Sequence, residues 1–262
     1  MKPLIVKLGG SVITDKRRHS VVKKAVLKRL ACELTAVKGP LVVVHGGGSF
    51  GHPLASKYKI AEGYRSKSQL MGVSLTHRAM ELLNYYVVEA LQKAGIPAMA
   101  VKPSSCTVLN KGRIESMDID PIKRMVALGL VPVLYGDVVL DVKSGVKILS
   151  GDQIVSYLAR KLGASKVIMG ADVDGVYVSL PKGNKKAELV RKITPADIKL
   201  VRSLGAAGTK DVTGGMRSKV LELLELAKLG IEAKIVNAAK PNILREAIQG
   251  KRVIGTTIYG RD

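Results

Sequence analysis

Short apolar runs alternate with longer stretches of helical periodicity along most of the chain. Six runs have the length and composition of buried strands: Leu4–Leu8, Leu41–Val44, Ala98–Val101, Val131–Leu134, Lys166–Met169 and Ala233–Val236. Between them, apolar residues recur at helical spacing over Val21–Val37, Ser68–Ala94, Gln153–Leu162, Pro195–Leu204 and Met216–Leu229. This alternation predicts an α/β fold, with a mainly parallel sheet covered by helices on both faces.

Two segments depart from this alternation. Val138–Val142 and Val146–Leu149, joined by a turn around Gly145, predict a β-hairpin ahead of the helix at Gln153. The loop-rich stretch Val178–Lys192 is interpreted as a mobile surface element. Nothing in the composition marks a domain boundary, so we expect one continuous fold.

The composition indicates a folded, globular chain. Its 262 residues are 47% hydrophobic, yet the apolar runs are far shorter than the roughly 20 residues that a membrane span needs. The N-terminus leads directly into the first strand without a signal-peptide pattern, which favours the cytoplasm. Cys32 and Cys106 are too few for a disulfide framework or a zinc site.

The formal charge of +22 raises the question of a nucleic-acid partner. The lysines and arginines are spread along the whole chain, however, and aromatic residues make up only 3% of it, with no Trp. Surfaces on which bases could stack are therefore scarce. The charge fits better with solubility and with the capture of small polyanions.

The stretch from His45 to His52 reads His-Gly-Gly-Gly-Ser-Phe-Gly-His and directly follows a predicted strand. Glycines at this place remove the β-carbons, so that bare backbone amides can approach an anionic ligand. His52 adds a side chain that can donate to a phosphate and partly neutralise it. An ordinary glycine-rich turn is the alternative for this stretch taken alone.

The first strand leads into a second glycine turn, Lys7-Leu8-Gly9-Gly10-Ser11, followed by Lys16. The spacing is not that of a Walker A loop. Lys7 lies in an otherwise apolar strand, where a charge is costly unless it is paired or faces a ligand. The alternatives are an edge-strand position for Lys7 and an ordinary surface position for Lys16.

Three further motifs carry candidate residues. Asp152 follows Ser150-Gly151 at the start of a helix, where it is either a first-turn acid or a group that holds two ammonium ions. Asp172 follows a strand and suits a nucleotide site or a plain Asp-Gly turn. Gly215 opens a helix with Lys219 in its first turns, which favours a phosphate. Together these groups predict phosphoryl transfer, which depends mainly on charge neutralisation along the path between donor and acceptor.

In their order along the chain, these motifs resemble those of the amino acid kinase superfamily over essentially the whole length. Within it, His45–His52 and the segment Gly-Gly-Ser-Val-Ile-Thr-Asp-Lys ending at Lys16 are similar to the isopentenyl phosphate kinase family. The resemblance implies an open αβα sandwich and a homodimer. It also implies one kinase domain over 1–262, with an acceptor-binding lobe, 1–165, and an ATP-binding lobe, 166–262.

The resemblance also implies roles for single residues. Lys7 would contact the transferred phosphoryl group, Lys16 would stabilise the transition state, and Asp152 would organise the lysines. The acceptor would meet Gly47, Gly151 and His52, the last as a donor to its phosphate. The ATP site would comprise Lys7, Gly9, Gly10, Ser11, Gly48, Asp172, Gly215 and Lys219.

The implied reaction is the ATP- and Mg²⁺-dependent phosphorylation of isopentenyl phosphate to isopentenyl diphosphate in isoprenoid biosynthesis by an alternative mevalonate pathway. Dimethylallyl phosphate is a second expected acceptor, and no protein metal cage is visible. The prenyl tail needs an apolar pocket, for which the helix Ser68–Ala94 offers Leu70, Val73, Met80 or Leu83, although these residues also suit an ordinary core helix. A fosfomycin or phosphonate kinase of the same fold and a non-catalytic nucleotide-binding sensor are the alternatives.

Overall fold

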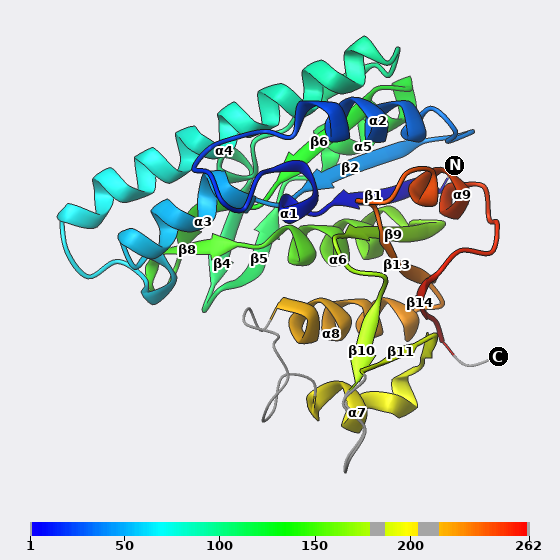
Figure 1. The fold of residues 1–262 in the computed structure, drawn as a ribbon. Coiled ribbons are helices and arrows are strands. Elements are labelled where there is room, and N and C mark those ends of the chain that lie inside the picture. Colours follow the sequence, from blue (N-terminus) through cyan, green and yellow to red (C-terminus); the bar gives the residue numbers. More distant parts are fainter. Residues whose placement is uncertain (1, 179–186, 204–214, 261–262) are drawn as a thin grey trace.

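The computed structural model describes residues 2–178, 187–203 and 215–260 (Figure 1). Its central sheet has the strand order β12-β14-β13-β9-β1-β2-β6-β3. Neighbouring strands pair in parallel, except that β13 and β14 are antiparallel. The strands are β1 (Leu4–Leu8), β2 (Leu41–His45), β3 (Ala98–Ala100), β6 (Val131–Tyr135), β9 (Lys166–Ala171), β12 (Lys192–Ile193), β13 (Ala233–Asn237) and β14 (Gly255–Ile258). All six predicted strands are present, with slightly shifted ends.

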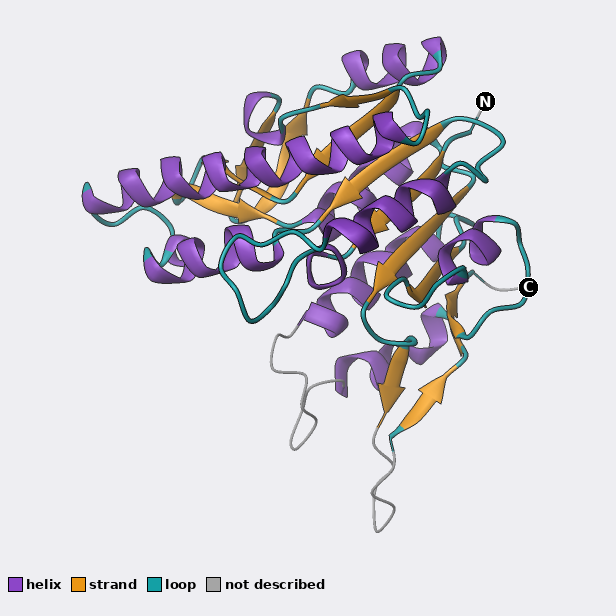
Figure 2. Ribbon diagram, turned by 45° about the horizontal axis from the view of Figure 1, so that its top comes forward, coloured by secondary structure: helices purple, strands orange, loops and turns teal. Residues whose placement is uncertain are grey.

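Helices cover both faces of this sheet (Figure 2). One face carries α2 (Lys24–Leu34), α3 (Gly48–Lys57), α4 (Ser68–Lys93) and α9 (Ile243–Ile248). The other carries α5 (Asp120–Leu128), α6 (Gly151–Leu162) and α8 (Gly215–Ala227). A buried apolar cluster fills the space on each side, as alternating side chains of the strands require. The predicted open αβα sandwich is therefore confirmed.

A second sheet of four strands, in the order β5-β4-β7-β8, lies beside the central one. The predicted hairpin is confirmed as β7 (Asp137–Asp141) and β8 (Gly145–Leu149). The strands β4 (Thr107–Asn110) and β5 (Arg113–Met117) were not predicted. The hairpin helps to enclose a small apolar cluster of Ala55, Ile60, Val138 and Val146.

Some predicted helices differ in extent. The helix predicted over Val21–Val37 starts only at Lys24, because Val22 forms an isolated antiparallel bridge with Thr14. The stretch Pro195–Leu204 contains a 3₁₀ turn, Pro195–Asp197, followed by α7 (Ile198–Ser203). The short α1 (Gly10–Ile13), together with α3, α5 and α9, was not predicted.

The segment interpreted as a mobile loop, Val178–Lys192, is only partly described. Residues 179–186 lie outside the described residues. At the two ends, β10 (Val176–Val178) and β11 (Glu188–Val190) pair antiparallel, so the described ends of this segment are strands. No helix in the described ranges is long and apolar enough to cross a membrane.

Candidate active site

Two glycine turns, at the carboxyl ends of β1 and β2, pack directly against each other. A β-carbon on Gly10 would lie 2.3 Å from the amide nitrogen of Gly48, and one on Gly46 would lie 2.8 Å from that of Gly10. Gly48 also has a φ of +49°, and its β-carbon would lie 2.1 Å from Thr14 Oγ1. Glycine is thus required here first by the contact of two backbones. The expected reason, close approach of a ligand to bare amides, does not by itself explain these positions.

The contact leaves backbone donors free. Four backbone amides have no hydrogen-bond acceptor in the described part of the chain: those of Gly10, Ser11, Gly47 and Gly48. They lie at the starts of α1 and α3, where amides have no partner within the helix. Helix α3 also directs the positive end of its dipole toward this place. The two turns together therefore offer four donors to an anion, as a phosphate site requires.

Lys7 lies in the middle of the central sheet, between β2 and β9. The edge-strand alternative for this residue is therefore wrong: Lys7 is 8% exposed. Its ammonium nitrogen lies 2.6 Å from Oδ1 of Asp152. Burial lowers the pKa of Lys7 to about 8, because the favourable charge of Asp152 offsets the desolvation only in part and Lys219 adds repulsion.

Asp152 joins two lysines from opposite parts of the chain. Ser150, not Asp152, caps α6, because its hydroxyl accepts from the amide of Gln153 at 3.2 Å. Lys219, on α8, donates to both carboxylate oxygens of Asp152, at 2.9 and 3.1 Å. Burial would raise the pKa of Asp152, but the charges of Lys7 and Lys219 outweigh it and hold the pKa below its usual value. The result is a largely buried anion between two ammonium groups.

Gly151 makes room for this cluster. A β-carbon at this position would lie 3.1 Å from Cε of Lys7 and 3.2 Å from the carbonyl oxygen of His45. The first turn of α6 can therefore approach β1 and β2 closely. In the structure Gly151 lies beside the lysine cluster, and its expected contact with an acceptor remains a prediction.

Lys16 belongs to a different pair. Its ammonium nitrogen lies 2.6 Å from Oδ2 of Asp172, and its side chain is 64% exposed. The expectation that Asp152 organises the lysines thus fits Lys7 and Lys219, and the structure corrects it for Lys16. Burial would raise the pKa of Asp172, but hydrogen bonds from Lys16 and Ser11 lower it overall. Asp172 follows the last residue of β9, so the pair links the first glycine turn to the predicted ATP-binding lobe.

The two histidines of the glycine motif have different environments. His52 is exposed on α3, and desolvation by its neighbours and the charge of Lys7 lower its pKa, so the ring is neutral at pH 7 in the free protein. His45 is fully buried, donates to the carbonyl oxygen of Gly46 and accepts from Asn84 Nδ2, both at 3.1 Å. Burial lowers its pKa to about 4. His45 is therefore a neutral core residue.

Other groups at the carboxyl ends of the strands complete the picture. Gly215 opens α8, and residues 204–214 before it lie outside the described residues. The sequence analysis missed a pair between the half-buried His77 and the buried Asp137, in which Nδ1 of His77 lies 2.9 Å from Oδ2 of Asp137. Burial raises the pKa of Asp137, although His77 opposes the shift. The position of Asp137 just after β6 is the signal that could have found it, because that strand ends at the same edge of the sheet.

The four residues that the sequence offers for an apolar pocket lie in different environments in the structure. Met80 and Leu83 are fully buried core residues, and Leu70 is exposed. Val73 packs against the small cluster of Ala55, Ile60, Val138 and Val146 under the hairpin. Ala55 lies on α3 together with His52, so this apolar cluster adjoins the helix that bears the exposed histidine.

The chain matches known proteins over nearly its whole length. The model described as "Amino acid kinase family" matches residues 2–237. A protein of Methanothermobacter thermautotrophicus named isopentenyl phosphate kinase is 41% identical, with 98% of this chain and 99% of the relative covered. Proteins of the same name from Methanocaldococcus jannaschii and Arabidopsis thaliana are 36% and 32% identical, over 97% and 90% of this chain and 97% and 87% of the relatives.

Solved structures agree with this likeness. One described as isopentenyl phosphate kinase superposes with a TM-score of 0.85 at 38% identity, covering 98% of this chain and 100% of the other. The product complex of the Thermoplasma acidophilum isopentenyl phosphate kinase gives a TM-score of 0.79 at 29% identity, with 97% and 99% covered. A Giardia carbamate kinase, at 13% identity and a TM-score of 0.72, shares the fold, with 98% of each chain covered.

Proposed function

The chain belongs to the amino acid kinase family, and from this premise we propose that it phosphorylates isopentenyl phosphate to isopentenyl diphosphate with ATP. The observation that carries the proposal is that the Lys7–Asp152–Lys219 cluster adjoins two glycine turns in which four amides have no acceptor among the described residues. The named relatives support the choice of acceptor, because isopentenyl phosphate kinases match nearly the full chain at 41% and 36% identity.

The proposed reaction transfers one phosphoryl group without a covalent enzyme intermediate. An oxygen of the acceptor phosphate forms a bond to the γ-phosphorus of ATP. The bond between this phosphorus and the oxygen bridging to the β-phosphorus breaks, and that oxygen leaves with ADP. Both reactants are polyanions, so catalysis requires positive charge held along the line of transfer.

The lysine cluster suits this requirement. Asp152 holds the ammonium groups of Lys7 and Lys219 close together before any substrate binds, at 2.6 and 2.9 Å from the same oxygen. Charges that are placed in advance need no reorganisation when the transition state forms. We assign Lys7 to the transferred phosphoryl group, Lys219 to the donor phosphates and Lys16 to the charge that develops in the transition state.

The proposed backbone contacts follow from the free amides. The free amides of Gly10, Ser11 and Gly48 would donate to the donor phosphates. Gly9, whose amide donates to the carbonyl oxygen of Gly170 at 2.8 Å, would only line the same nucleotide site, together with Asp172 and Gly215. Gly47 and Gly151 would face the acceptor. In this arrangement the line between donor and acceptor crosses the contact of the two glycine turns.

His52 and the apolar cluster support a prenyl monophosphate as the acceptor. A neutral histidine beside Lys7 can take up a proton when a phosphate binds and then donates a charge-assisted hydrogen bond. The apolar tail would enter toward Val73 and the cluster under the β7-β8 hairpin. A carboxylate-bearing amino acid would leave that apolar surface without a partner.

The accompanying proposals concern magnesium, assembly and location. Among the described residues, no group of three or more His, Cys, Asp or Glu could hold a metal ion, so Mg²⁺ would arrive with the ATP phosphates and keep several waters. The exposed Leu82 and Tyr85 share one face of α4 and are candidates for the contact of a homodimer. We expect the enzyme in the cytoplasm, where ATP is available.

An acceptor panel tests the proposal. The purified protein is incubated with ATP, Mg²⁺ and one acceptor each: isopentenyl phosphate, dimethylallyl phosphate, fosfomycin or N-acetylglutamate. ADP release and the ³¹P spectrum of the product are measured, with Asp152→Asn as the inactive control. We expect turnover of the prenyl phosphates, whereas turnover of fosfomycin alone, or of none, would overturn the proposal.

A further inference from the structure

One end of the central sheet has an uncovered face. Thr257 on β14 pairs with Lys234 on β13 and with Lys192 on β12, so the three side chains lie on the same face of the sheet. On this face α9 packs against β13 and β9. Thr257 is only half-buried and Lys192 is exposed, so the two edge strands remain open to solvent.

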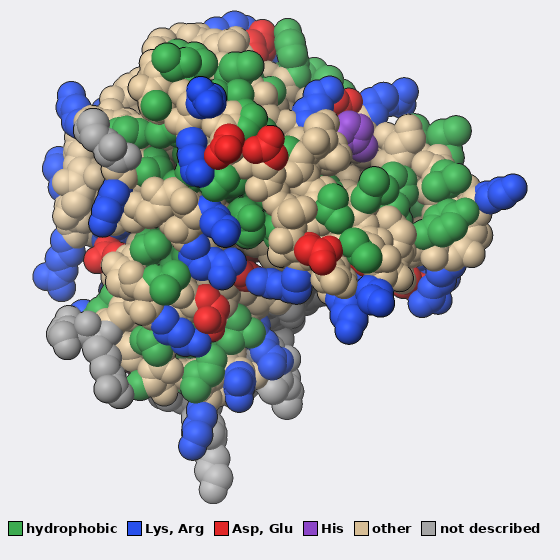
Figure 3. Space-filling model, turned by 180° about the vertical axis from the view of Figure 1, so that it is seen from behind, with side chains coloured by type: hydrophobic (Ala, Val, Ile, Leu, Met, Phe, Trp, Pro, Cys, Tyr) green, Lys and Arg blue, Asp and Glu red, His purple; other side chains and the backbone are tan. Residues whose placement is uncertain are grey.

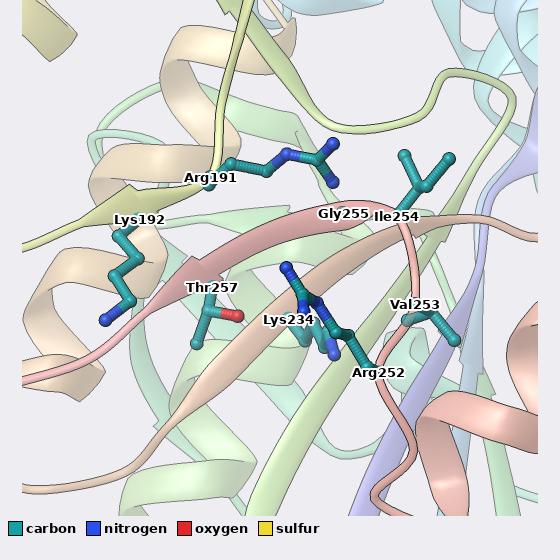
Figure 4. A pocket seen from close by; sticks show the side chains of 8 residues that line it. All are labelled: Arg191, Lys192, Lys234, Arg252, Val253, Ile254, Gly255 and Thr257. Carbon is teal, nitrogen blue, oxygen red and sulfur yellow. The ribbon is translucent and has the colours of Figure 1, made fainter.

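A cavity of about 570 Å³ occupies this end of the sheet (Figure 4). Its lining consists of Arg191, Lys192, Lys234, Arg252, Val253, Ile254, Gly255 and Thr257. Four of these residues are basic and none is acidic. The volume lies in the range of about 300 to 1,000 Å³ that is usual for small-ligand sites.

Most of the positive charge at the cavity is not paired with an acidic side chain in the described residues. Arg191, Lys234 and Arg252 make no ion pair within the described ranges, whereas nearby Lys166 pairs with Glu232 at 2.7 Å. Burial lowers the pKa of Lys234 and the charge of Lys166 adds to this shift, while the charge of Glu232 opposes it. An anion in the cavity would offset the repulsion between the two lysines.

The location separates this cavity from the candidate active site. The cavity extends along β13: Lys234 is the second residue of that strand, and Gly255 pairs with Val236 near its carboxyl end. The cavity is lined by residues of the outer strands β12, β14 and β13 and of the segment before β14, and β9 separates these strands from β1 and its glycine turn. It shares no lining residue with the candidate active site. A ligand here need not compete with ATP or with the acceptor.

We propose that this cavity is a second anion site that binds a small organic phosphate or diphosphate. The planar guanidinium groups of Arg191 and Arg252 are suited to phosphate oxygens, and the hydroxyl of Thr257 adds a donor. Val253 and Ile254 provide an apolar wall for the organic part. In Figure 4 Lys192 points away from Arg191 and Arg252, and its ammonium lies over the ring of Tyr259, so it contributes charge at the rim.

A small ligand fits the cavity better than a nucleic-acid backbone. The cations line one concave site, whereas on the face shown in Figure 3 lysines and arginines are dispersed among other residues. No aromatic side chain lines the cavity on which a base could stack. The proposal does not depend on the function proposed above, because it rests on a different set of residues.

Calorimetric titration with inorganic diphosphate tests the site. Arg191→Gln combined with Arg252→Gln should remove one class of binding, or weaken it at least about tenfold, and leave prenyl phosphate turnover unchanged. The matched control is Arg124→Gln combined with Arg160→Gln. It removes the same charge from exposed positions on α5 and α6 and should bind like the wild type.

The other outcomes overturn the proposal. Identical isotherms for the wild type and the Arg191→Gln/Arg252→Gln protein would show that diphosphate binds only elsewhere. Equal weakening in both double variants would indicate a general effect of net charge. A single-stranded RNA oligonucleotide serves as a competitor. If it displaced diphosphate from this site at a concentration below that of the diphosphate itself, nucleic acid would be identified as the occupant. A thermal unfolding midpoint equal to that of the wild type shows that each variant is folded, whatever acceptor the enzyme uses.

Discussion

Lys16 pairs with Asp172 at 2.6 Å, while Asp152, the other carboxylate of the site, holds Lys7 and Lys219. The two pairs differ in burial: the Lys16 side chain is 64% exposed and that of Lys7 is 10% exposed. An exposed ion pair contributes only about 0 to 1 kcal/mol, so Lys16 can exchange Asp172 for a phosphate at little cost. The buried cluster, in contrast, is fixed before substrate binds.

Replacing Lys16 tests its assignment to the transition state. Lys16→Ala should lower kcat by about two to three orders of magnitude, as the loss of one transition-state donor does. The Kd for ATP and the free energy of unfolding should stay nearly unchanged, because the pair with Asp172 is exposed. Lys28→Ala, an exposed lysine on α2, is the control. Wild-type kcat in Lys16→Ala would rule out the assigned role.

Replacing Asp152 tests the buried cluster. Asp152→Asn leaves two ammonium groups without a counter-charge, and breaking a buried ion pair costs about 3 to 5 kcal/mol. We expect a loss of stability toward the lower end of this range, together with a severe loss of turnover. Urea unfolding measures the first and ADP release the second. Asp172→Asn, at the exposed pair, should cost less than about 1 kcal/mol of stability; an equal effect of the two substitutions would contradict the role of burial.

The pKa of Lys7 predicts opposite effects of pH on activity and stability. With a pKa of about 8 in the free protein, Lys7 loses its charge above that pH, so kcat/KM should fall there. The folded pKa is below the ordinary value of 10.5, so the unfolded chain binds more protons between about 8 and 10.5. The contribution of Lys7 to stability therefore rises with pH over this window.

Pairs of pH profiles measure both effects. Lys7→Arg keeps its charge throughout, so its kcat/KM, although lower overall, should not fall near pH 8. Urea unfolding at pH 7 and pH 10 gives the free energy of unfolding of the wild type and of Lys7→Arg. The contribution of Lys7 is the change between the two pH values in the wild type minus the change in Lys7→Arg. A fall near pH 8 that persists in Lys7→Arg would assign it to another group.

His52 should affect the acceptor and not the nucleotide. His52→Asn should raise the KM for isopentenyl phosphate about tenfold, as the loss of a hydrogen bond to a charged group does, and leave the KM for ATP unchanged. Ser56→Ala, exposed on the same helix, is the control. In the wild type, the NMR titration of His52 should lie below its usual pKa in the free protein and shift upward with bound acceptor phosphate. Equal changes in both KM values would contradict this assignment.

The contact between the glycine turns predicts a steric effect. Gly10→Ala places a β-carbon 2.3 Å from the nitrogen of Gly48, so the turns must separate. We expect a loss of about 1 to 3 kcal/mol in stability and little remaining turnover. Gly95→Ala is the control, because its φ of +81° is strained for alanine but its surroundings are open. It should lose about 1 kcal/mol and keep its activity, as measured by thermal unfolding and ADP release.

The hydrophobic pattern of the sequence predicts the strands of the central sheet better than it predicts short or irregular elements such as α3 and β5. The strands of the central sheet are apolar runs, because parallel strands are buried on both faces. Helix α3 was missed because its sequence contains two glycines and Pro53, which are poor helix formers. Its packing against α4 stabilises it, with Met80 of α4 lying against Gly47 and Gly51. The exposed strand β5 lacks a regular apolar alternation and so left no signal.

By itself, the sequence determined which residues meet in the site. Lys7, Asp172 and the glycine turns follow or end parallel strands, and the carboxyl ends of such strands share one edge of the sheet. Only the tertiary structure decided how they pair: Lys7 and Lys219 with Asp152, Lys16 with Asp172, and Gly10 against Gly48. These contacts join residues far apart in the chain, and the register of strands and the closeness of two backbones select among them. No local period of the sequence carries that information.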